Sequence, residues 1–331
     1  MKSTITDVAK KAGVSMKTVS RVLNKEPNVA EKTRERVLEV AKELRYSPNI
    51  AARGLASSKS YLLALLYDNP SPNYIANIQK GAIDACRDNG YHLVVEPINM
   101  SKINVGVAVD LLLERLPVDG IILTPPLCDD EDVLKILKRL KIPYIPVAPA
   151  EESEHLSFVK MDDVQAAYEM TEFLIRQGHR KIGFIAGHPE HSATKLRYQG
   201  FVKAMNAVGL KVRDEWVVEG DFSFKSGVDA AETLLGLSEC PTAIFASNDD
   251  MAAGVVSVAS RLGVSVPDDL SVGGFDDTPL AKILYPQLTT IQQPIYEMGH
   301  RAANLLIKPP KEQERLSSYC LEHKLIVRDS T

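Results

Sequence analysis

The spacing of apolar residues divides the chain into a short helical segment and a longer segment in which strands and helices alternate. Over residues 4–44, apolar side chains recur at intervals of three and four, which predicts short helices around one small core. Thr4 is expected to cap the first helix, Gly13 to end it, and Ser15 to cap the second. The pattern is therefore helix, glycine turn, capped helix.

A third helix over about residues 31–44 is expected to close this core. Its N-cap position holds Ala30 in place of a capping side chain, a difference worth about 0.5–2 kcal/mol in the usual substitution series. We still expect the helix to form, because tertiary packing contributes most of the stability of protein helices. The side chains expected to pack inward are Val37, Leu38, Val40, Ala41 and Leu44.

Beyond residue 60, unbroken apolar runs of strand length alternate with helical segments. The run at residues 61–67 is typical of a strand that is buried on both faces and stopped by a polar loop. The alternation continues to about residue 161, restarts there, and reaches a last apolar strand at residues 271–275. It predicts a small all-α head followed by an α/β core of two lobes, each built on a doubly wound parallel sheet.

The second predicted helix has two different faces. Val19, Val22 and Leu23 can pack on the core, and the opposite face is polar or long-chained. Such a face suits the DNA major groove, where Arg or Lys bonds guanine acceptors and hydroxyl groups reach phosphates. The residues expected to face DNA are Met16, Lys17, Thr18, Ser20 and Arg21.

The helical segment and the longer α/β segment also differ in net charge. Residues 1–60 contain 13 of the 39 Lys and Arg residues and 6 of the 43 Asp and Glu residues, a net charge of +7. Residues 61–331 then carry a net charge of −11, so the overall charge of −4 combines a basic head with an acidic core. The basic head suits a polyanionic partner, and the acidic core does not.

Polar residues follow several predicted strands of the core. Open α/β sheets bind ligands outside the carboxyl ends of their strands, and two such edges can face one another across a cleft. A sugar needs carboxylate, amide and Arg partners for its hydroxyl groups and an aromatic side chain for its apolar face. Residues of these types near strand ends are Asp68, Asn69, Arg197, Phe222, Asn248, Asp249, Asp276 and Asp277.

The head resembles the opening of the lactose/galactose repressor (LacI) family. The resemblance rests on residues 7–24 in the pattern DVAxxAGVSxxTVSRVLN, where x marks a position that carries no match. It continues through Tyr46-x-Pro48-Asn49 and Ala52-Arg53-x-Leu55, and it extends over nearly the whole chain. It implies a helix-turn-helix DNA-binding domain at residues 1–46, a hinge at 47–60 and a periplasmic-binding-protein-like core at 61–331. Within the core, the implied N-subdomain spans about 61–161 and 292–325, and the C-subdomain about 162–291.

The hinge segment can form a helix of only about two turns. Ser47 and Pro48 can begin it, and isolated helices this short are marginal in water. The resemblance implies that this helix forms on operator DNA and places Leu55 as a wedge in the minor groove. With this resemblance, the expected DNA-binding residues are Thr4, Ser15, Met16, Lys17, Thr18, Ser20, Arg21, Asn24, Asn49, Ala52 and Leu55.

In the core, the resemblance implies a sugar effector held between the two lobes. Arg197, Asn248, Asp276 and Gln293 match effector-binding positions of the family, and Phe222 falls where an aromatic residue often stacks on the sugar. The complete expected set is Asp68, Asn73, Tyr74, Arg197, Phe222, Asn248, Asp276 and Gln293. The protein is then expected to repress carbohydrate-utilisation genes as a homodimer on palindromic operator DNA. Sugar is expected to release the operator, with corepression as the alternative.

Two other classes of protein share parts of this pattern. An exported sugar-binding protein would need a signal peptide, and no long apolar run follows Met1-Lys2; it would also leave the basic head unexplained. An enzyme would need a catalytic motif, and neither a Gly-x-Ser-x-Gly elbow nor a phosphate-binding glycine loop appears. We therefore expect a cytoplasmic transcription factor without a membrane span.

No metal or cofactor is expected. His188-x-x-His191 with Glu190 has the residue types of a metal site but lacks further ligands nearby in the sequence. Wide separation and the absence of paired spacing predict reduced thiols for the four cysteines, Cys86, Cys128, Cys240 and Cys320.

Overall fold

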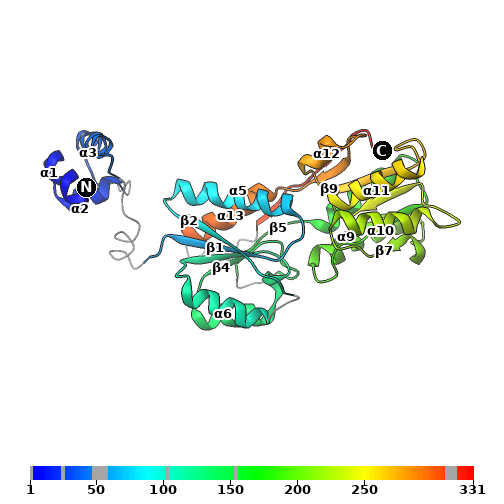
Figure 1. The fold of residues 1–331 in the computed structure, drawn as a ribbon, viewed down its shortest axis with the longest axis horizontal. Helices are drawn as coiled ribbons and strands as arrows, with labels where there is room; N and C mark the ends of the chain where they lie inside the picture. The colour runs from blue at the N-terminus through cyan, green and yellow to red at the C-terminus, as the bar shows by residue number, and fades with distance from the viewer. Residues whose placement is uncertain (1–2, 24–26, 47–58, 101–103, 153–155, 310–318) are drawn as a thin grey trace. The chain divides into compact units, whose positions relative to one another are not determined.

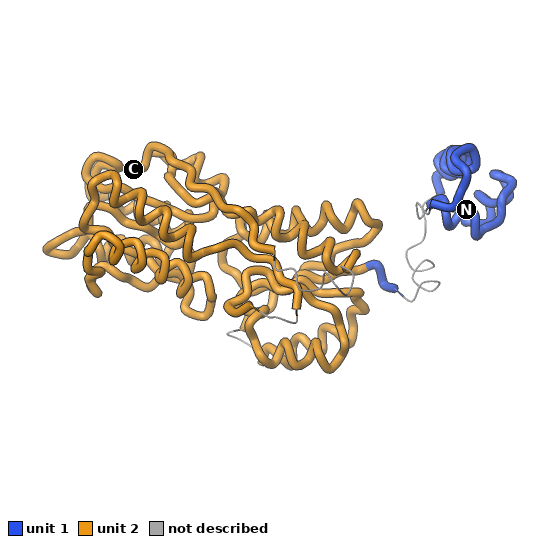
Figure 2. Tube along the Cα trace, turned by 180° about the vertical axis from the view of Figure 1, so that it is seen from behind, with its two compact units in different colours: residues 1–61 blue, residues 62–331 orange. Residues whose placement is uncertain are grey.

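The computed structural model describes residues 3–23, 27–46, 59–100, 104–152, 156–309 and 319–331. They form two compact units, one within residues 1–61 and the other within residues 62–331 (Figure 2). Most of the predicted hinge lies outside the described residues, and with it the predicted DNA contacts Asn49, Ala52 and Leu55. Asn24 also lies outside them.

The first unit contains the helices α1 (Ile5–Ala12), α2 (Met16–Leu23) and α3 (Glu31–Glu43). A capping box opens α1, because the Thr4 hydroxyl accepts the Asp7 amide and the Asp7 carboxylate accepts the Thr4 amide. Gly13 ends α1 with a φ of 63°, a conformation that suits a residue without a Cβ. The Ser15 hydroxyl accepts the Thr18 amide at 3.1 Å and so caps α2 as predicted.

One apolar core holds these three helices together. It is formed by Val8, Ala9, Ala12, Val19, Val22, Val37, Val40 and Ala41. The prediction for Leu38 is wrong, since this residue is 47% exposed. The buried stripe of α3 follows residues 37, 40, 41 and 44, and Leu38 lies beside that stripe. Ala30 makes no side-chain cap bond, as expected, and α3 nevertheless forms.

The second unit has two lobes, of which the N-lobe contains a four-stranded parallel sheet in the order β2-β1-β3-β4. Its strands are β1 (Leu62–Tyr67), β2 (His92–Pro97), β3 (Gly120–Leu123) and β4 (Tyr144–Pro146). One face is covered by α5 (Pro72–Asp88) and α13 (Ile295–Ile307), the other by α6 (Val105–Arg115) and α7 (Glu131–Leu140) (Figure 1). Gly81 lets α5 and α13 touch, because a Cβ there would lie 1.9 Å from the Tyr296 carbonyl oxygen.

The C-lobe contains a six-stranded sheet in the order β12-β10-β9-β8-β6-β7, parallel except for the antiparallel pair β10–β12. Its strands are β6 (Ile182–Ile185), β7 (Val217–Val218), β8 (Ala243–Ala246), β9 (Ser271–Asp276), β10 (Thr289–Gln292) and β12 (Lys324–Ile326). One face is covered by α8 (Asp163–Arg176) and α9 (Ser192–Ala207), the other by α10 (Phe224–Leu235) and α11 (Asp249–Leu262). The short α12 (Pro279–Ile283) follows β9.

The chain passes between the lobes three times. The crossings run from β5 (Val159–Met161) to α8, from β10 to α13, and from β11 (Tyr319–Leu321) to β12. The last crossing therefore precedes Lys324, whereas the expected N-subdomain extended to residue 325. The apolar pattern did not predict β10, β11 or β12, because these strands are short and partly polar; Thr289 and Thr290 of β10 are both fully buried.

The predicted fold class is confirmed: a helix-turn-helix head is followed by a bilobal α/β core with mostly parallel sheets. Within the described ranges, no helix combines the length and the apolar character needed to cross a membrane.

Candidate functional site

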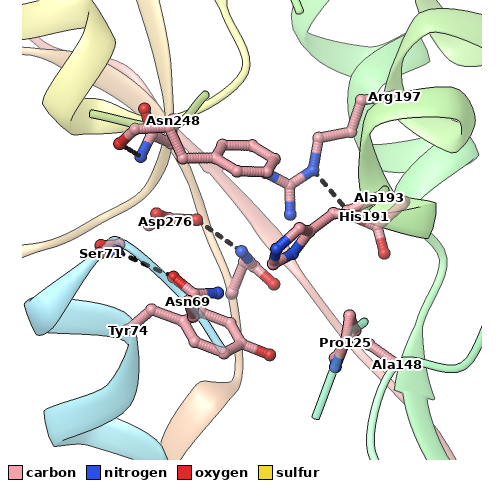
Figure 3. Close-up of a pocket in the computed structure, with 13 residues that line it drawn as sticks. Asn69, Ser71, Tyr74, Pro125, Ala148, His191, Ala193, Arg197, Asn248 and Asp276 are labelled. Atoms are coloured by element: carbon pink, nitrogen blue, oxygen red, sulfur yellow. Dashed lines mark hydrogen bonds and ion pairs between the residues drawn. The ribbon is translucent and has the colours of Figure 1, made fainter. Parts of the chain in front are cut away.

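A cavity between the two lobes of the core is formed by residues that follow the carboxyl ends of strands in both sheets. The space between its lining atoms, counted out into open solvent, is about 460 Å³. Tyr74 approaches from the N-lobe, and Arg197 and His191 approach from the C-lobe (Figure 3). The lining residues are Asn69, Ser71, Tyr74, Pro125, Ala148, Asp163, His191, Ala193, Arg197, Phe222, Asn248, Asp276 and Gln293.

The structure brings most of the expected effector residues together in this cavity. Those that line it are Tyr74, Arg197, Phe222, Asn248, Asp276 and Gln293. Asp68 and Asn73 do not line it. The Asp68 carboxylate instead accepts the Met100 amide at 3.0 Å, which directs it toward the loop after β2. Its neighbour Asn69, which was also named as a polar residue after this strand, lines the cavity.

Arg197 is held by two hydrogen bonds and a cation–π contact. Its Nε donates to Asp163 Oδ1 at 2.8 Å and its Nη1 to the Ser247 carbonyl oxygen at 2.5 Å. The guanidinium carbon lies 3.7 Å from the centroid of the Phe275 ring, a cation–π contact. Because Arg197 is 5% exposed and its Nη2 has no hydrogen-bond partner among the described residues, that nitrogen is available to a ligand.

Asp276 lies opposite Arg197 and is fixed by Gln293, whose Nε2 donates to Asp276 Oδ1 at 2.5 Å. Burial raises the pKa of Asp276 well above its ordinary value, and the positive charge of Arg197 partly offsets the effect. The backbone of Asp276 has a φ of 120°, a conformation that costs roughly 1–3 kcal/mol for a residue with a side chain. Strain of this kind is common where a fold holds a side chain for binding.

Asn248 and Phe222 form one connected wall. Asn248 Nδ2 donates to the Phe222 carbonyl oxygen at 2.8 Å, and Asn248 Oδ1 accepts the Met251 amide at 2.9 Å. Asn248 thus caps α11 and holds the loop that carries Phe222. Phe222, with a φ of 69°, is 6% exposed, and its ring meets the His191 ring edge to face with centroids 5.5 Å apart.

Several lining residues were not predicted as effector contacts. Asp163 opens α8 directly after β5, so it follows a strand end just as the predicted carboxylates do, and this signal could have found it. His191 was weighed only as a metal ligand, but the structure places it beside Phe222 in the cavity. Burial, with the charges of His188 and Arg197, lowers the pKa of His191 to about 4, so its ring is neutral at neutral pH.

Two hydrogen bonds join the lobes beside the cavity. The Ser71 hydroxyl, from the start of α5, donates to Asp250 Oδ2 in α11 at 3.0 Å. The Ser192 hydroxyl, at the start of α9, donates to the Ala148 carbonyl oxygen after β4 at 3.3 Å. A ligand that changes the distance between these strand ends therefore also changes the contact between the lobes.

The head presents a second candidate surface on α2. Met16, 53% exposed, and Lys17 face outward, while Val19 and Val22 are buried, as the pattern predicts. Ser20 and Arg21 are half-buried. The Thr18 hydroxyl lies 2.9 Å from the Ser15 hydroxyl in the helix cap, and the Thr4 hydroxyl donates to Asp7 Oδ2. These three hydroxyl groups already have intramolecular partners. The Met16 thioether accepts a long, weak hydrogen bond from the Thr6 hydroxyl at 3.4 Å.

The histidine, cysteine and acidic side chains of the described part of the chain do not gather into a metal site. No group of three or more His, Cys, Asp or Glu side chains there is arranged to hold a metal ion. The His188 Nδ1 accepts the Glu190 amide, so Glu190 and His188 form a local turn. All four cysteines are free thiols, of which Cys86 and Cys128 are buried.

Sequence comparison matches two family models to this chain. The model described as bacterial regulatory proteins, lacI family, matches residues 4–49, and that of a periplasmic binding protein-like domain matches residues 171–331. Catabolite control protein A of Priestia megaterium is 39% identical over the full length of both chains. The HTH-type transcriptional repressor PurR of Actinobacillus pleuropneumoniae serotype 3 (strain JL03) is 34% identical over 99% of this chain and 98% of its own.

Solved structures also match nearly the whole chain. The lac repressor dimer bound to operator and the anti-inducer ONPF is 28% identical, with a TM-score of 0.80 over 100% of this chain and 99% of its own. The complex of the transcriptional regulator CelR with cellobiose is 30% identical, with a TM-score of 0.75 over 99% of this chain and 100% of its own. The similarity thus extends over both the head and the core.

Proposed function

Because the chain belongs to the LacI family of bacterial regulatory proteins, we propose that it represses genes of carbohydrate use and that a sugar in the interlobe cavity controls its binding to operator DNA. The observation that carries this proposal is the composition of the cavity. It combines a free Arg197 nitrogen, the Asp276 carboxylate and the Gln293 amide with the Phe222 ring. Hydroxyl groups of a sugar need such polar partners, and its C–H face needs the ring.

The DNA-binding part of the proposal rests on the exposed face of α2. Met16 and Lys17 are directed away from the buried core of the head, so a major groove can receive them. The net charge of +7 over residues 1–60 supplies attraction to phosphates. Binding to a palindromic operator requires a dimer, and one of the similar structures is a repressor dimer on operator.

Control would operate as a coupling free energy between two sites. A sugar that contacts Tyr74 on one lobe and Arg197 on the other favours one relative orientation of the lobes. In a dimer, that orientation sets the separation of the two hinge segments, residues 47–60, and hence whether both fold on the minor groove. Catalysis has no role in this scheme, and the relatives named above are transcription regulators.

The direct test is operator release. The purified full-length protein, bound to a labelled operator fragment selected from random DNA, would be titrated with a panel of mono- and disaccharides. We expect one neutral sugar to change operator affinity at least about fivefold, the lower end of typical allosteric couplings. Removing residues 1–58 should abolish DNA binding and leave sugar binding intact. If sugars bind and operator affinity never changes, the proposed control is wrong.

Leu55→Ala should weaken operator binding by about tenfold and leave sugar affinity unchanged. The smaller side chain cannot act as a wedge between base steps, and the bent complex then loses contacts that offset the cost of unstacking. Gel retardation of Leu55→Ala would measure the loss of operator affinity. Ser57→Ala, which also shortens a side chain of the same segment to Ala, is the control. Equal operator affinity of Leu55→Ala and wild type would remove the wedge from the mechanism.

Gly187→Ala should reduce sugar affinity on the order of tenfold by displacing the aromatic wall. An added Cβ at this position would lie 2.0 Å from Phe222 Cζ, so the ring must leave its place. The contact of a ring with a sugar face contributes about 1 kcal/mol, and displacement also disturbs the Asn248 bond to the same loop. Calorimetry would compare this variant with Pro189→Ala, an exposed position of the same loop. Unaltered affinity would show that Phe222 does not touch the sugar.

A further inference from the structure

His191 is a buried polar side chain whose ring has no hydrogen-bond partner among the described residues. It occupies the N-cap position of α9 and makes no side-chain cap bond. The residue is 6% exposed and lies in the cavity wall (Figure 3). The contacts of its ring are edge-to-face packing against Phe222 and His188, each with centroids 5.5 Å apart. A buried imidazole needs a hydrogen-bond partner, so its nitrogens are expected to bond either water or a ligand in the cavity.

The ring nitrogens of His191 are not sealed inside the protein. Among the described residues, the fully enclosed side-chain polar atom that lacks a partner is Asp129 Oδ2, in the N-lobe. The nitrogens of His191 therefore reach the cavity space rather than the apolar core. They lie on the same wall as the free nitrogen of Arg197.

The charges around the cavity limit what this ring can meet. The charged lining residues are Arg197, Asp163 and Asp276, and the Arg197 guanidinium is already paired with Asp163. His191 adds no positive charge at neutral pH, because burial, His188 and Arg197 lower its pKa to about 4. A phosphate or carboxylate on the ligand would therefore be buried in a cavity whose guanidinium is already paired with Asp163, and leaving its charge unneutralised is costly.

We infer that His191 is a specificity-determining ligand contact and that the effector is an uncharged sugar, not a sugar phosphate or a sugar acid. A neutral imidazole has one N–H donor and one acceptor nitrogen, which suits two neighbouring hydroxyl groups of a sugar. Phe222 holds the ring in place from the side, so its polar edge is fixed before the ligand arrives. This inference rests on the proposed function of the cavity and adds the charge class of the effector to it.

Matched pairs of probes test the charge class. Calorimetry with the full-length protein would pair glucose with glucose 6-phosphate and with glucuronic acid, and galactose with galactose 6-phosphate; cellobiose would be an additional neutral probe. We expect a neutral probe to bind at least tenfold more tightly than its charged counterpart. A charged probe that binds more tightly than its neutral counterpart would overturn the inference.

His191→Phe tests the contact itself, because it keeps an aromatic ring against Phe222 and removes both nitrogens. Two neutral hydrogen bonds predict a loss of roughly tenfold in affinity for the neutral probe that binds the wild type. His191→Asn, which retains a donor and an acceptor, should recover part of it. Glu190→Gln is the control, since Glu190 is an exposed residue of the same loop and does not line the cavity. If His191→Phe binds as tightly as wild type while Arg197→Ala does not, the inference about His191 fails and the proposed function stands.

A measurement on the free protein tests the ring without any ligand or substitution. In protein labelled with ¹⁵N in the histidine rings, the His191 nitrogens should show the two well-separated resonances of a neutral imidazole at pH 6.5. A ring that is protonated at this pH would present two donors and a positive charge, and it would overturn the inference.

Discussion

Replacing Arg197 with Ala should give a protein that still binds operator but no longer responds to sugar. The guanidinium makes charge-assisted bonds, each worth about 1.5–3 kcal/mol, and its free nitrogen is expected to make another with the ligand. Losing that last bond predicts a drop in sugar affinity of about 10- to 100-fold. Calorimetry would measure the affinity, and gel retardation would measure the operator response.

The same change should destabilise the C-lobe by about 3–5 kcal/mol. Asp163, whose side chain is 5% exposed, would be left as a buried carboxylate without its partner. The double variant Arg197→Ala/Asp163→Ala should recover much of this stability and none of the sugar response, which separates folding from binding. Arg197→Lys should fall between wild type and Ala, because the donors of an ammonium group share one nitrogen and cannot match the spacing of the guanidinium nitrogens that bond Asp163 and the Ser247 carbonyl. On α9, Lys195→Ala is an exposed control.

Normal sugar affinity in Arg197→Ala would place the effector elsewhere. If the double variant recovers sugar affinity as well as stability, Arg197 acts by stabilising the lobe rather than by touching the ligand.

Asp249 is expected to make the C-lobe less stable as pH rises from about 4 to 7. This carboxylate is fully buried and accepts three hydrogen bonds, from the Thr278 amide, the Thr278 hydroxyl and the Thr290 hydroxyl, at 2.7, 3.0 and 2.6 Å. Burial raises the pKa of Asp249 from 3.8 to about 7, against the opposing effect of these bonds. The folded protein then holds the proton more tightly than the unfolded chain does.

The direction of this pH dependence follows from proton linkage. Below about pH 3.8 both states are protonated and the stabilising contribution is complete; it is lost as pH rises through the folded pKa near 7. The expected loss is of order 1–4 kcal/mol. Asp249→Asn should remove this dependence, so the free energy of unfolding of wild type minus that of the variant should fall between pH 4.5 and 7.5. Urea denaturation at several pH values would measure it, with the exposed Asp214→Asn as control.

Asp249→Ala should cost about 3 kcal/mol or more at every pH, because it leaves buried donors of Thr278 and Thr290 without an acceptor. Since these residues hold the turn after Asp276, we also expect weaker sugar binding. A difference between wild type and Asp249→Asn that is constant with pH would show that Asp249 does not titrate in this range.

The local sequence alone determined the architecture of the head and the existence of two α/β lobes. Capping at Thr4 and Ser15 and the turn at Gly13 are interactions between near neighbours, so their residue types suffice to predict them. Fully apolar strands such as β1 and β8 are also readable from the sequence, because burial on both faces leaves no polar position. The partly polar strands β10 and β12 could not be predicted from the sequence, because their burial depends on partners far away in the chain.

The cavity shows where the sequence ceases to be sufficient. Residue types at strand ends, with the family resemblance, placed Arg197, Asp276 and Gln293 correctly in its wall. Only the tertiary structure decided that Asp68 turns toward Met100 and that Asn69 faces the cavity, because adjacent residues after a strand point to different sides. It also decided that His191 lies against Phe222, with no hydrogen bond from its ring to any described residue, a relation between two loops that no local pattern contains.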